Sequence, residues 1–178
     1  MMIGRTASRA GVVLACLWLA ISALAASAAA PAIYFTSNLT PQPDPGAVTP
    51  LEQALLEQIA AATTTIDAAL YEFDRPSLRD ALLGANGRGV RVRIVTDDQA
   101  NYSEDDWPIY QALENAGVEI VNDYGLGDDL RVHDKYLIID GQSVWSGSAN
   151  LTAADLTSNH NNALLLVSPA LVTPIAAL

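Results

Sequence analysis

The chain has 178 residues, 51% hydrophobic and 16% charged, which suits a single domain with an apolar core of its own. Its 20 acidic residues outnumber 9 basic ones, and the net charge of −11 argues against broad binding to nucleic-acid backbones or anionic lipid, except where basic groups gather locally. The only cysteine, Cys16, excludes an internal disulfide and a cysteine-cluster metal site.

Residues 1–30 have the layout of a secretory signal peptide. Arg5 and Arg9 form a positive start, residues 10–26 are almost entirely apolar, and small residues follow. A cut after Ala28 fits better than one after Ala30, because a proline comes next. We therefore expect an exported domain at residues 31–178, secreted or periplasmic, with a net charge of −13 once the two arginines are removed. An uncleaved membrane anchor is the alternative, since the apolar stretch is about long enough to span a bilayer.

After the leader, strands and helices are expected to alternate. We expect a strand at residues 32–37, a stiff loop at 41–46 and a helix from Pro50, with Thr49 as its N-cap and Glu52 closing a capping box. Further helices are expected at residues 78–87 and 107–116, and strands at 64–73, 89–95, 118–121, 136–139, 144–145 and 163–167. Asp140-Gly141 is a strong signal for a tight hairpin turn.

This order predicts the α/β class. Helices that separate strands favour a three-layer sandwich, with a mixed, mostly parallel sheet flanked by helices on both faces. The hairpin is the one antiparallel excursion expected.

The most informative motif follows the third predicted helix. It reads H-x-K-x4-D-x6-G-S-x-N and comprises His133, Lys135, Asp140, Gly147, Ser148 and Asn150. A neutral imidazole is a good nucleophile for phosphorus, and a lysine two residues along a strand shares its face and can hold a phosphoryl oxygen. Ser148 and Asn150 can donate hydrogen bonds, and Gly147 allows close approach of the substrate. Taken alone, these polar residues are also ordinary turn and helix-cap residues.

This motif resembles the signature of the phospholipase D superfamily. Similar residues are found outside it, at Tyr71, Asp74, Leu78, 81–82, 88–90, 92–93 and Asp97. The resemblance implies a metal-free and cofactor-free phosphodiesterase in which His133 forms a phosphohistidine and Lys135 and Asn150 hold the phosphate. Asp140 belongs to the signature and is counted with the catalytic residues, although its place before Gly141 favours a supporting role at the turn.

Two departures from the family pattern affect the prediction. Members use two such motifs, and the histidine of the second protonates the leaving group. This chain has one motif. Its other histidine, His160, supplies no second motif, because no lysine follows it two residues later. The small dimeric endonucleases of the family carry a glutamate that orients the nucleophilic histidine, at the position that Asn161 occupies here. An asparagine can accept the imidazole proton but cannot stabilise an imidazolium by charge.

Residues 168–178 begin what resembles a closing helix and then end, so we expect the chain either to be truncated, as half of a two-motif protein, or to form a homodimer. The leading hypothesis is a nuclease-like hydrolase of phosphodiesters, with nucleic acid or phospholipid as substrate. The alternatives are a phospholipase or phosphatidyltransferase, and a non-catalytic half that completes a partner's site. No stable membrane anchor is expected if the leader is cleaved.

Overall fold

The computed structural model describes residues 29–36, 44, 46–101, 107–124, 131–170 and 172. The predicted signal peptide lies almost wholly outside these residues, as do most of the predicted loop at 41–46 and of the closing helix. Ala29, the first described residue, already belongs to a strand that was predicted to begin at residue 32. At the other end, the Val172 N–H donates to the Ser168 carbonyl at 3.0 Å, which makes one helical turn.

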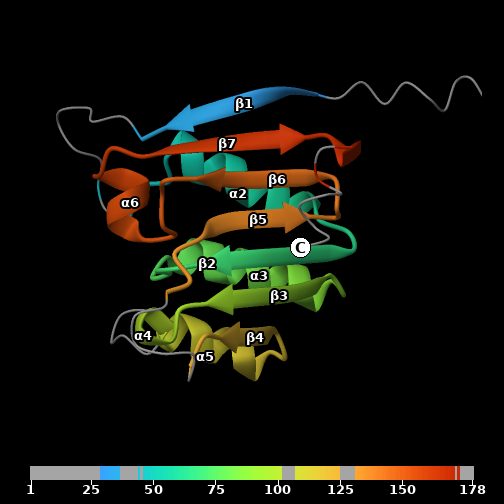
Figure 1. Cartoon of the computed structure of the whole chain (residues 1–178), viewed down its shortest axis with the longest axis vertical. Helices are drawn as coiled ribbons and strands as arrows, with labels where there is room; N and C mark the ends of the chain where they lie inside the picture. The colour runs from blue at the N-terminus through green and yellow to red at the C-terminus, as the bar shows by residue number, and fades with distance from the viewer. Residues whose placement is uncertain are drawn as a thin grey trace, which may run out of the picture.

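The described residues form one seven-stranded sheet with the order β1-β7-β6-β5-β2-β3-β4 (Figure 1). Its strands are β1 (Ala29–Phe35), β2 (Thr65–Leu70), β3 (Arg91–Thr96), β4 (Glu119–Asn122), β5 (Lys135–Ile139), β6 (Ser143–Gly147) and β7 (Asn162–Val167). The α/β class with a mixed, helix-flanked sheet is confirmed. The predicted predominance of parallel pairing is wrong: β2 pairs in parallel with β3, and β3 with β4, but the other ladders among the described strands are antiparallel.

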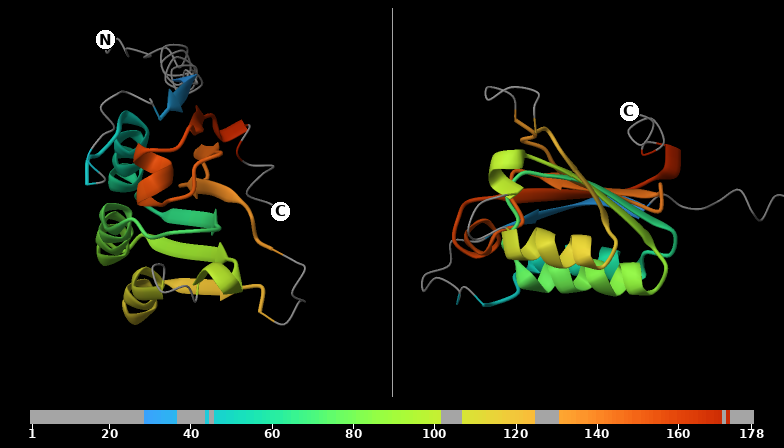
Figure 2. Two further views of the ribbon diagram at one scale, coloured as in Figure 1. Left: turned by 90° about the vertical axis from the view of Figure 1, so that its left-hand side faces the viewer. Right: turned by 90° about the horizontal axis from the view of Figure 1, so that it is seen from below.

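Three helices lie side by side on one face of the sheet: α2 (Pro50–Ala61), α3 (Pro76–Gly87) and α5 (Trp107–Asn115) (Figure 2). They cover the main core, which includes Leu55, Leu82, Ile94 and Trp145. Two short helices, α4 (Asp98–Asn101) and α6 (Ala153–Thr157), lie at one edge of the sheet. No described helix is both long enough and apolar enough to cross a bilayer.

The opposite face of the sheet carries a smaller apolar cluster. It consists of Ile138, Val144 and Val172, with Tyr136 packed against them. Within the described residues, this cluster is therefore covered by the segment that follows β7. Helices of the described chain lie mainly on the first face, so the predicted covering of both faces is seen only in part.

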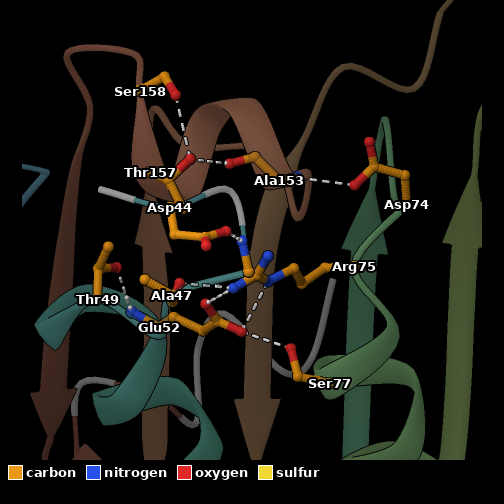
Figure 3. A network of polar contacts seen from close by, with 11 residues as sticks. Asp44, Ala47, Thr49, Glu52, Asp74, Arg75, Ser77, Ala153, Thr157 and Ser158 are labelled. Atoms are coloured by element: carbon orange, nitrogen blue, oxygen red, sulfur yellow. Dashed lines mark hydrogen bonds and ion pairs between the residues drawn. The ribbon is translucent and has the colours of Figure 1, made fainter. Parts of the chain in front are cut away.

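The start of α2 confirms one half of the predicted capping box and corrects the other. Thr49 is the N-cap, and its hydroxyl accepts the Glu52 N–H at 3.4 Å. The Glu52 side chain does not reach back to the cap. It is fully buried and accepts hydrogen bonds from Arg75 Nε at 2.9 Å and Nη2 at 2.8 Å, and one from the Ser77 hydroxyl (Figure 3). A buried carboxylate requires a cationic partner, and α3 supplies one at its N-cap.

Arg75 also donates hydrogen bonds to two backbone segments beside this ion pair. Arg75 Nη2 donates to the Ala47 carbonyl at 2.7 Å, and the Arg75 N–H donates to the Leu151 carbonyl at 3.1 Å. Next to it, Asp74 Oδ1 accepts the Ala153 N–H at the start of α6 (Figure 3). The segment between β2 and α3 is thus tied to the segment between β6 and α6.

Candidate active site

The segments that carry most of the signature residues meet at one edge of the sheet, beside α6 (Figure 1). Because β5 runs antiparallel to β2 and β6, and β7 antiparallel to β6, the beginning of β5 and of β7 lies next to the ends of β2 and β6. His133 and Lys135 stand at the start of β5, and Ser148 and Asn150 directly follow β6. Tyr71 and Glu72 follow β2, and Asn161 precedes β7. The antiparallel half of the sheet therefore brings together residues that lie far apart in sequence.

The side chains of His133 and Lys135 lie next to each other, as their two-residue spacing predicts. Lys135 Nζ lies 3.4 Å from Nδ1 and 3.5 Å from Nε2 of His133, and it donates to the His133 carbonyl at 2.9 Å. Tyr71 supports both residues: its ring centroid lies 4.6 Å from the imidazole centroid and 5.2 Å from Lys135 Nζ. The exposed imidazole is thus open to a substrate and has an ammonium group beside it.

Burial lowers the pKa of Lys135 from its ordinary value of 10.5, because the ammonium is partly removed from water. The charges of Asp155, Glu72 and Asp134 act in the opposite direction and favour the protonated form. Lys135 is therefore a cation set among acidic groups.

Ser148 and Asn161 bond to each other rather than projecting freely. The Ser148 hydroxyl donates to Asn161 Oδ1 at 2.8 Å and accepts the Asn162 N–H at 3.1 Å. Asn161 Nδ2 donates to the Asp155 carbonyl at 3.1 Å. Asn161, at the position where the small endonucleases of the resembled family carry a glutamate, therefore uses its amide oxygen to accept a hydrogen bond from Ser148.

Gly147 serves strand packing. A Cβ atom at this position would lie 2.1 Å from the Asn162 carbonyl oxygen and 2.7 Å from Ala163 Cα. The close approach that requires glycine is thus that of β7, where the sequence analysis expected that of a substrate.

Asn150 is held by acidic residues from two other segments. Its backbone N–H donates to Asp155 Oδ2 at 2.8 Å, and its side-chain Nδ2 donates to Glu72 Oε2 at 3.2 Å. Glu72 is in turn fixed through its carbonyl, which accepts the Leu151 N–H at 3.1 Å. These contacts place the Asn150 amide at the same edge as Lys135.

The structure does not bring Asp140 to this group. Asp140 follows the last residue of β5, five residues beyond Lys135, which is roughly 17 Å along a strand. Its carboxylate accepts the backbone N–H groups of Thr63, Thr64 and Thr65 and the hydroxyls of Thr63 and Thr64, at 2.8–3.0 Å. Assignment of Asp140 to the catalytic residues is thus replaced by a structural role, the one its position before Gly141 favoured.

The environment of Asp140 fits that role. Its partial burial favours the neutral acid, but the hydrogen bonds from Thr65, Thr64 and Thr63 outweigh burial and hold its pKa well below the ordinary value of 3.8. Asp140 and Gly141 have φ values of 54° and 62°, as a tight hairpin turn requires. The carboxylate thus fastens this turn to the chain between α2 and β2.

Three arginines outside the signature, Arg88, Arg91 and Arg93, lie elsewhere in the fold. Arg88 donates to the carbonyls of Ile59, Ala60 and Ala62 at the end of α2, and Arg93 pairs with Asp67 at 2.6 Å. Arg91 begins β3, at the edge opposite to the site. Lys135 therefore remains the basic group that these observations place at the site.

One acidic cluster among the described residues has metal-ligand spacing. Carboxylate oxygens of Asp97, Asp98 and Asp123 lie within 4.8 Å of one another. Arg131 Nη1 lies 3.8 Å from Asp97 Oδ1, and Asp123 Oδ1 accepts the Asp98 N–H. Two of the three carboxylates therefore already interact with an arginine or a backbone N–H.

A family model described as cardiolipin synthase, PLD-like domain, matches residues 55–178. This chain belongs to the phospholipase D superfamily. The match covers both the signature and the helices and strands that carry it.

Two curated relatives are similar to this chain over about two thirds of its length. A mitochondrial cardiolipin hydrolase from Danio rerio is 31% identical over 120 residues, which cover 67% of this chain and 51% of that protein. The corresponding protein from Xenopus laevis is 34% identical over 111 residues, 62% of this chain and 50% of that protein. The chain spans about half the length of these curated relatives.

Two solved structures have the same fold. Nuc from Salmonella typhimurium, titled a phospholipase D family member, superposes with a TM-score of 0.67 at 28% identity, covering 83% of this chain and 90% of that one. NucT from Helicobacter pylori gives a TM-score of 0.65 at 18% identity, over 83% and 92% of the two chains, and shows the fold alone. The family model and the fold therefore agree on membership of the superfamily.

Two acidic residues at the site were not predicted from the sequence. Glu72 and Asp155 lie outside the signature, and neither has a spacing to a motif residue that would reveal a contact. Glu72 lies 78 residues before Asn150. Asp155 sits three residues after the Thr152 N-cap of α6, a local position that predicts a helix start and no more.

Proposed function

We propose that this chain is the phosphodiester-cleaving unit of an exported enzyme in which His133 is the nucleophile. The observation that carries the proposal is the placement of Lys135 Nζ within 3.5 Å of both imidazole nitrogens, at an edge that also presents the Asn150 amide. A phosphodiester needs a nucleophile, groups that neutralise its non-bridging oxygens and an acid for the leaving oxygen. His133, Lys135 and Asn150 supply the first two requirements.

The proposed reaction has two steps. A ring nitrogen of His133 attacks phosphorus, a P–N bond forms, and the P–O bond to the leaving group breaks as that oxygen takes a proton from the acid. Water then attacks the phosphohistidine, the P–N bond breaks, and a phosphate monoester and the free imidazole result. Lys135 and the remaining N–H of the Asn150 amide hold the non-bridging oxygens through both steps.

The acid is proposed to come from a second copy of the motif. This chain has one H-x-K motif, so the second histidine belongs to a homodimer partner or to a further half of the protein. The alternative from another functional class is a non-catalytic half that completes a partner's site. A complete motif with an accessible imidazole favours catalysis over that alternative.

The proposed substrate class is nuclease-like, following the resemblance to the small dimeric endonucleases of the superfamily. A second candidate is a phospholipid, which the names of the curated relatives favour, since each is a cardiolipin hydrolase. The net charge of −11 weakens binding of any polyanion at a distance, and it leaves a local site as the determinant of the substrate.

The test is a substrate panel with the full chain and its His133→Ala variant. Single-stranded DNA, RNA, and vesicles of cardiolipin or phosphatidylcholine are offered separately, and the products are quantified. We expect one class to be cleaved by the wild type and none by the variant, and an alkaline quench to trap the phosphoryl part of the substrate, with its remaining ester group, on the wild-type protein. Cleavage by His133→Ala at the wild-type rate would contradict the proposal. Cell fractionation with N-terminal sequencing tests export and cleavage of the leader.

A further inference from the structure

The side chain of Asn150 has two ends with different surroundings. Its Nδ2 donates to Glu72 Oε2 at 3.2 Å, whereas its Oδ1 is buried and has no hydrogen-bond partner among the described residues. Its backbone is fixed separately, by Asp155 Oδ2 at 2.8 Å. The main chain therefore determines where Asn150 stands, and Glu72 is the group that distinguishes the two ends of its amide.

An asparagine amide has two orientations that differ by a half-turn and have nearly the same shape. Turned the other way, Asn150 would direct its carbonyl oxygen at the Glu72 carboxylate, and two acceptors would face each other. The carboxylate thus selects the orientation in which the N–H groups point toward it. Nδ2 carries two hydrogens, so one N–H can bond Glu72 while the other stays available as a donor.

We propose that Glu72 is a positioning residue, which holds the Asn150 amide so that an N–H group, and not the carbonyl oxygen, meets the phosphate of the substrate. The inference rests on the proposed function and extends it to a residue outside the signature. Glu72 is well placed for this task, because its carbonyl accepts the Leu151 N–H at 3.1 Å and its neighbour Tyr71 contacts His133.

The same carboxylate also acts on Lys135. The charged or titratable groups around the Lys135 ammonium are Glu72, Asp134, Asp155, His133 and Tyr71. Burial lowers the pKa of Lys135, while the negative charge of Glu72 opposes that shift. Loss of the charge should therefore let Lys135 lose its proton at a lower pH, which moves the alkaline limit of activity downward.

A carboxylate beside a phosphate could instead be only a repulsive neighbour. The two readings predict opposite signs for Glu72→Gln, which keeps the size of the side chain and removes its charge. A repulsive neighbour, once neutralised, lets phosphate bind more tightly. A positioning residue, once neutralised, no longer selects one amide orientation, since glutamine both donates and accepts, and phosphate then binds more weakly.

The experiment compares the full-length wild type with Glu72→Gln, Glu72→Ala and the control Glu57→Gln. Glu57 lies on the exposed side of α2, where it accepts a hydrogen bond from Gln53 at 2.9 Å, so its replacement removes the same charge away from the site. Calorimetric titration with inorganic phosphate measures binding without turnover. Hydrolysis of bis(p-nitrophenyl) phosphate gives kcat, KM and their pH dependence, and circular dichroism checks the fold.

We expect both Glu72 variants to bind phosphate more weakly, with kcat/KM reduced by about 10- to 100-fold, as is typical for outer partners of functional groups. KM should rise and the alkaline limit should shift to lower pH, while Glu57→Gln matches the wild type. Equal or tighter phosphate binding by both Glu72 variants would overturn the inference, as would a wild type that binds no phosphate. A wild type that binds phosphate but hydrolyses nothing would contradict the proposed function alone, because the titration still decides the role of Glu72.

Discussion

Replacing Arg75 with methionine should destabilise the fold severely. Glu52 is fully buried, and Arg75 donates two of its hydrogen bonds, at 2.9 and 2.8 Å. Methionine has a comparable length and no donor, so the variant keeps much of the packing and leaves the carboxylate with the Ser77 hydroxyl. Removing one partner of a buried pair costs about 3–5 kcal/mol. That is a large share of the roughly 5–15 kcal/mol by which domains are stable.

Urea unfolding monitored by circular dichroism measures the loss. With a slope of about 2 kcal/mol per molar, the midpoint should fall by about 2 M. Arg79→Met on the same helix is the control, because Arg79 pairs with Asp80 at the surface and surface pairs contribute about 0–1 kcal/mol. The double variant Glu52→Leu/Arg75→Met removes the stranded charge and should regain at least about 2 kcal/mol over the single variant. A single variant that loses less than about 1 kcal/mol, or a double variant no more stable than it, would refute the reasoning.

Four further predictions concern the site and its support. Hydrolysis should persist in excess chelator, because Lys135 and Asn150 neutralise the phosphate; complete loss that zinc or magnesium restores would overturn this mechanism. Mixing His133→Ala subunits with wild-type ones should give defective heterodimers if each site uses two histidines, whereas a fully active monomer would show that the acid lies elsewhere. Lys135→Arg should keep its fold by circular dichroism and lose about two to three orders of magnitude in rate, since a planar guanidinium does not replace a point charge; near-normal turnover would count against phosphate binding by Lys135. Asp140→Asn should lose about 1–3 kcal/mol at pH 7. Because folding lowers the pKa of Asp140, its contribution is complete above the ordinary value of 3.8 and disappears as the pH falls through the lower folded-state value. The stability gap between this variant and the wild type should therefore narrow in acid, and a gap that stays constant down to pH 2 would count against the assigned role.

Local signals in the sequence predicted local structure well. Thr49 is the N-cap of α2 as expected, and Asp140-Gly141 makes the hairpin turn. The helix predicted at residues 107–116 is α5, Trp107–Asn115. The close pairing of His133 with Lys135 also followed from two-residue spacing along the chain. Each of these features depends on residues only a few positions apart.

Contacts between distant segments could not be predicted in the same way. Glu52 satisfied a capping-box pattern, yet its carboxylate pairs with Arg75, 23 residues later, because α2 and α3 pack together. The alternation of helices and strands suggested a parallel sheet, but β5 inserts beside β2 in the antiparallel direction. A pattern within one segment carries no information on which strand will lie next to it. The contact between Glu72 and Asn150 could not be predicted for the same reason, because the two residues lie on segments far apart in the sequence.

The pairing of β1 with β7 joins the first and last strands of the described chain. Thr36, directly after β1, accepts the Asn161 N–H across a sequence separation of 125 residues. Contacts at such separations form slowly, because a long loop must close before they contribute any stability. The first strand can therefore take its place only after nearly all of the domain has been synthesised. Until then β1 has no partner strand, and its unpaired backbone groups expose the newly made chain to strand-to-strand aggregation.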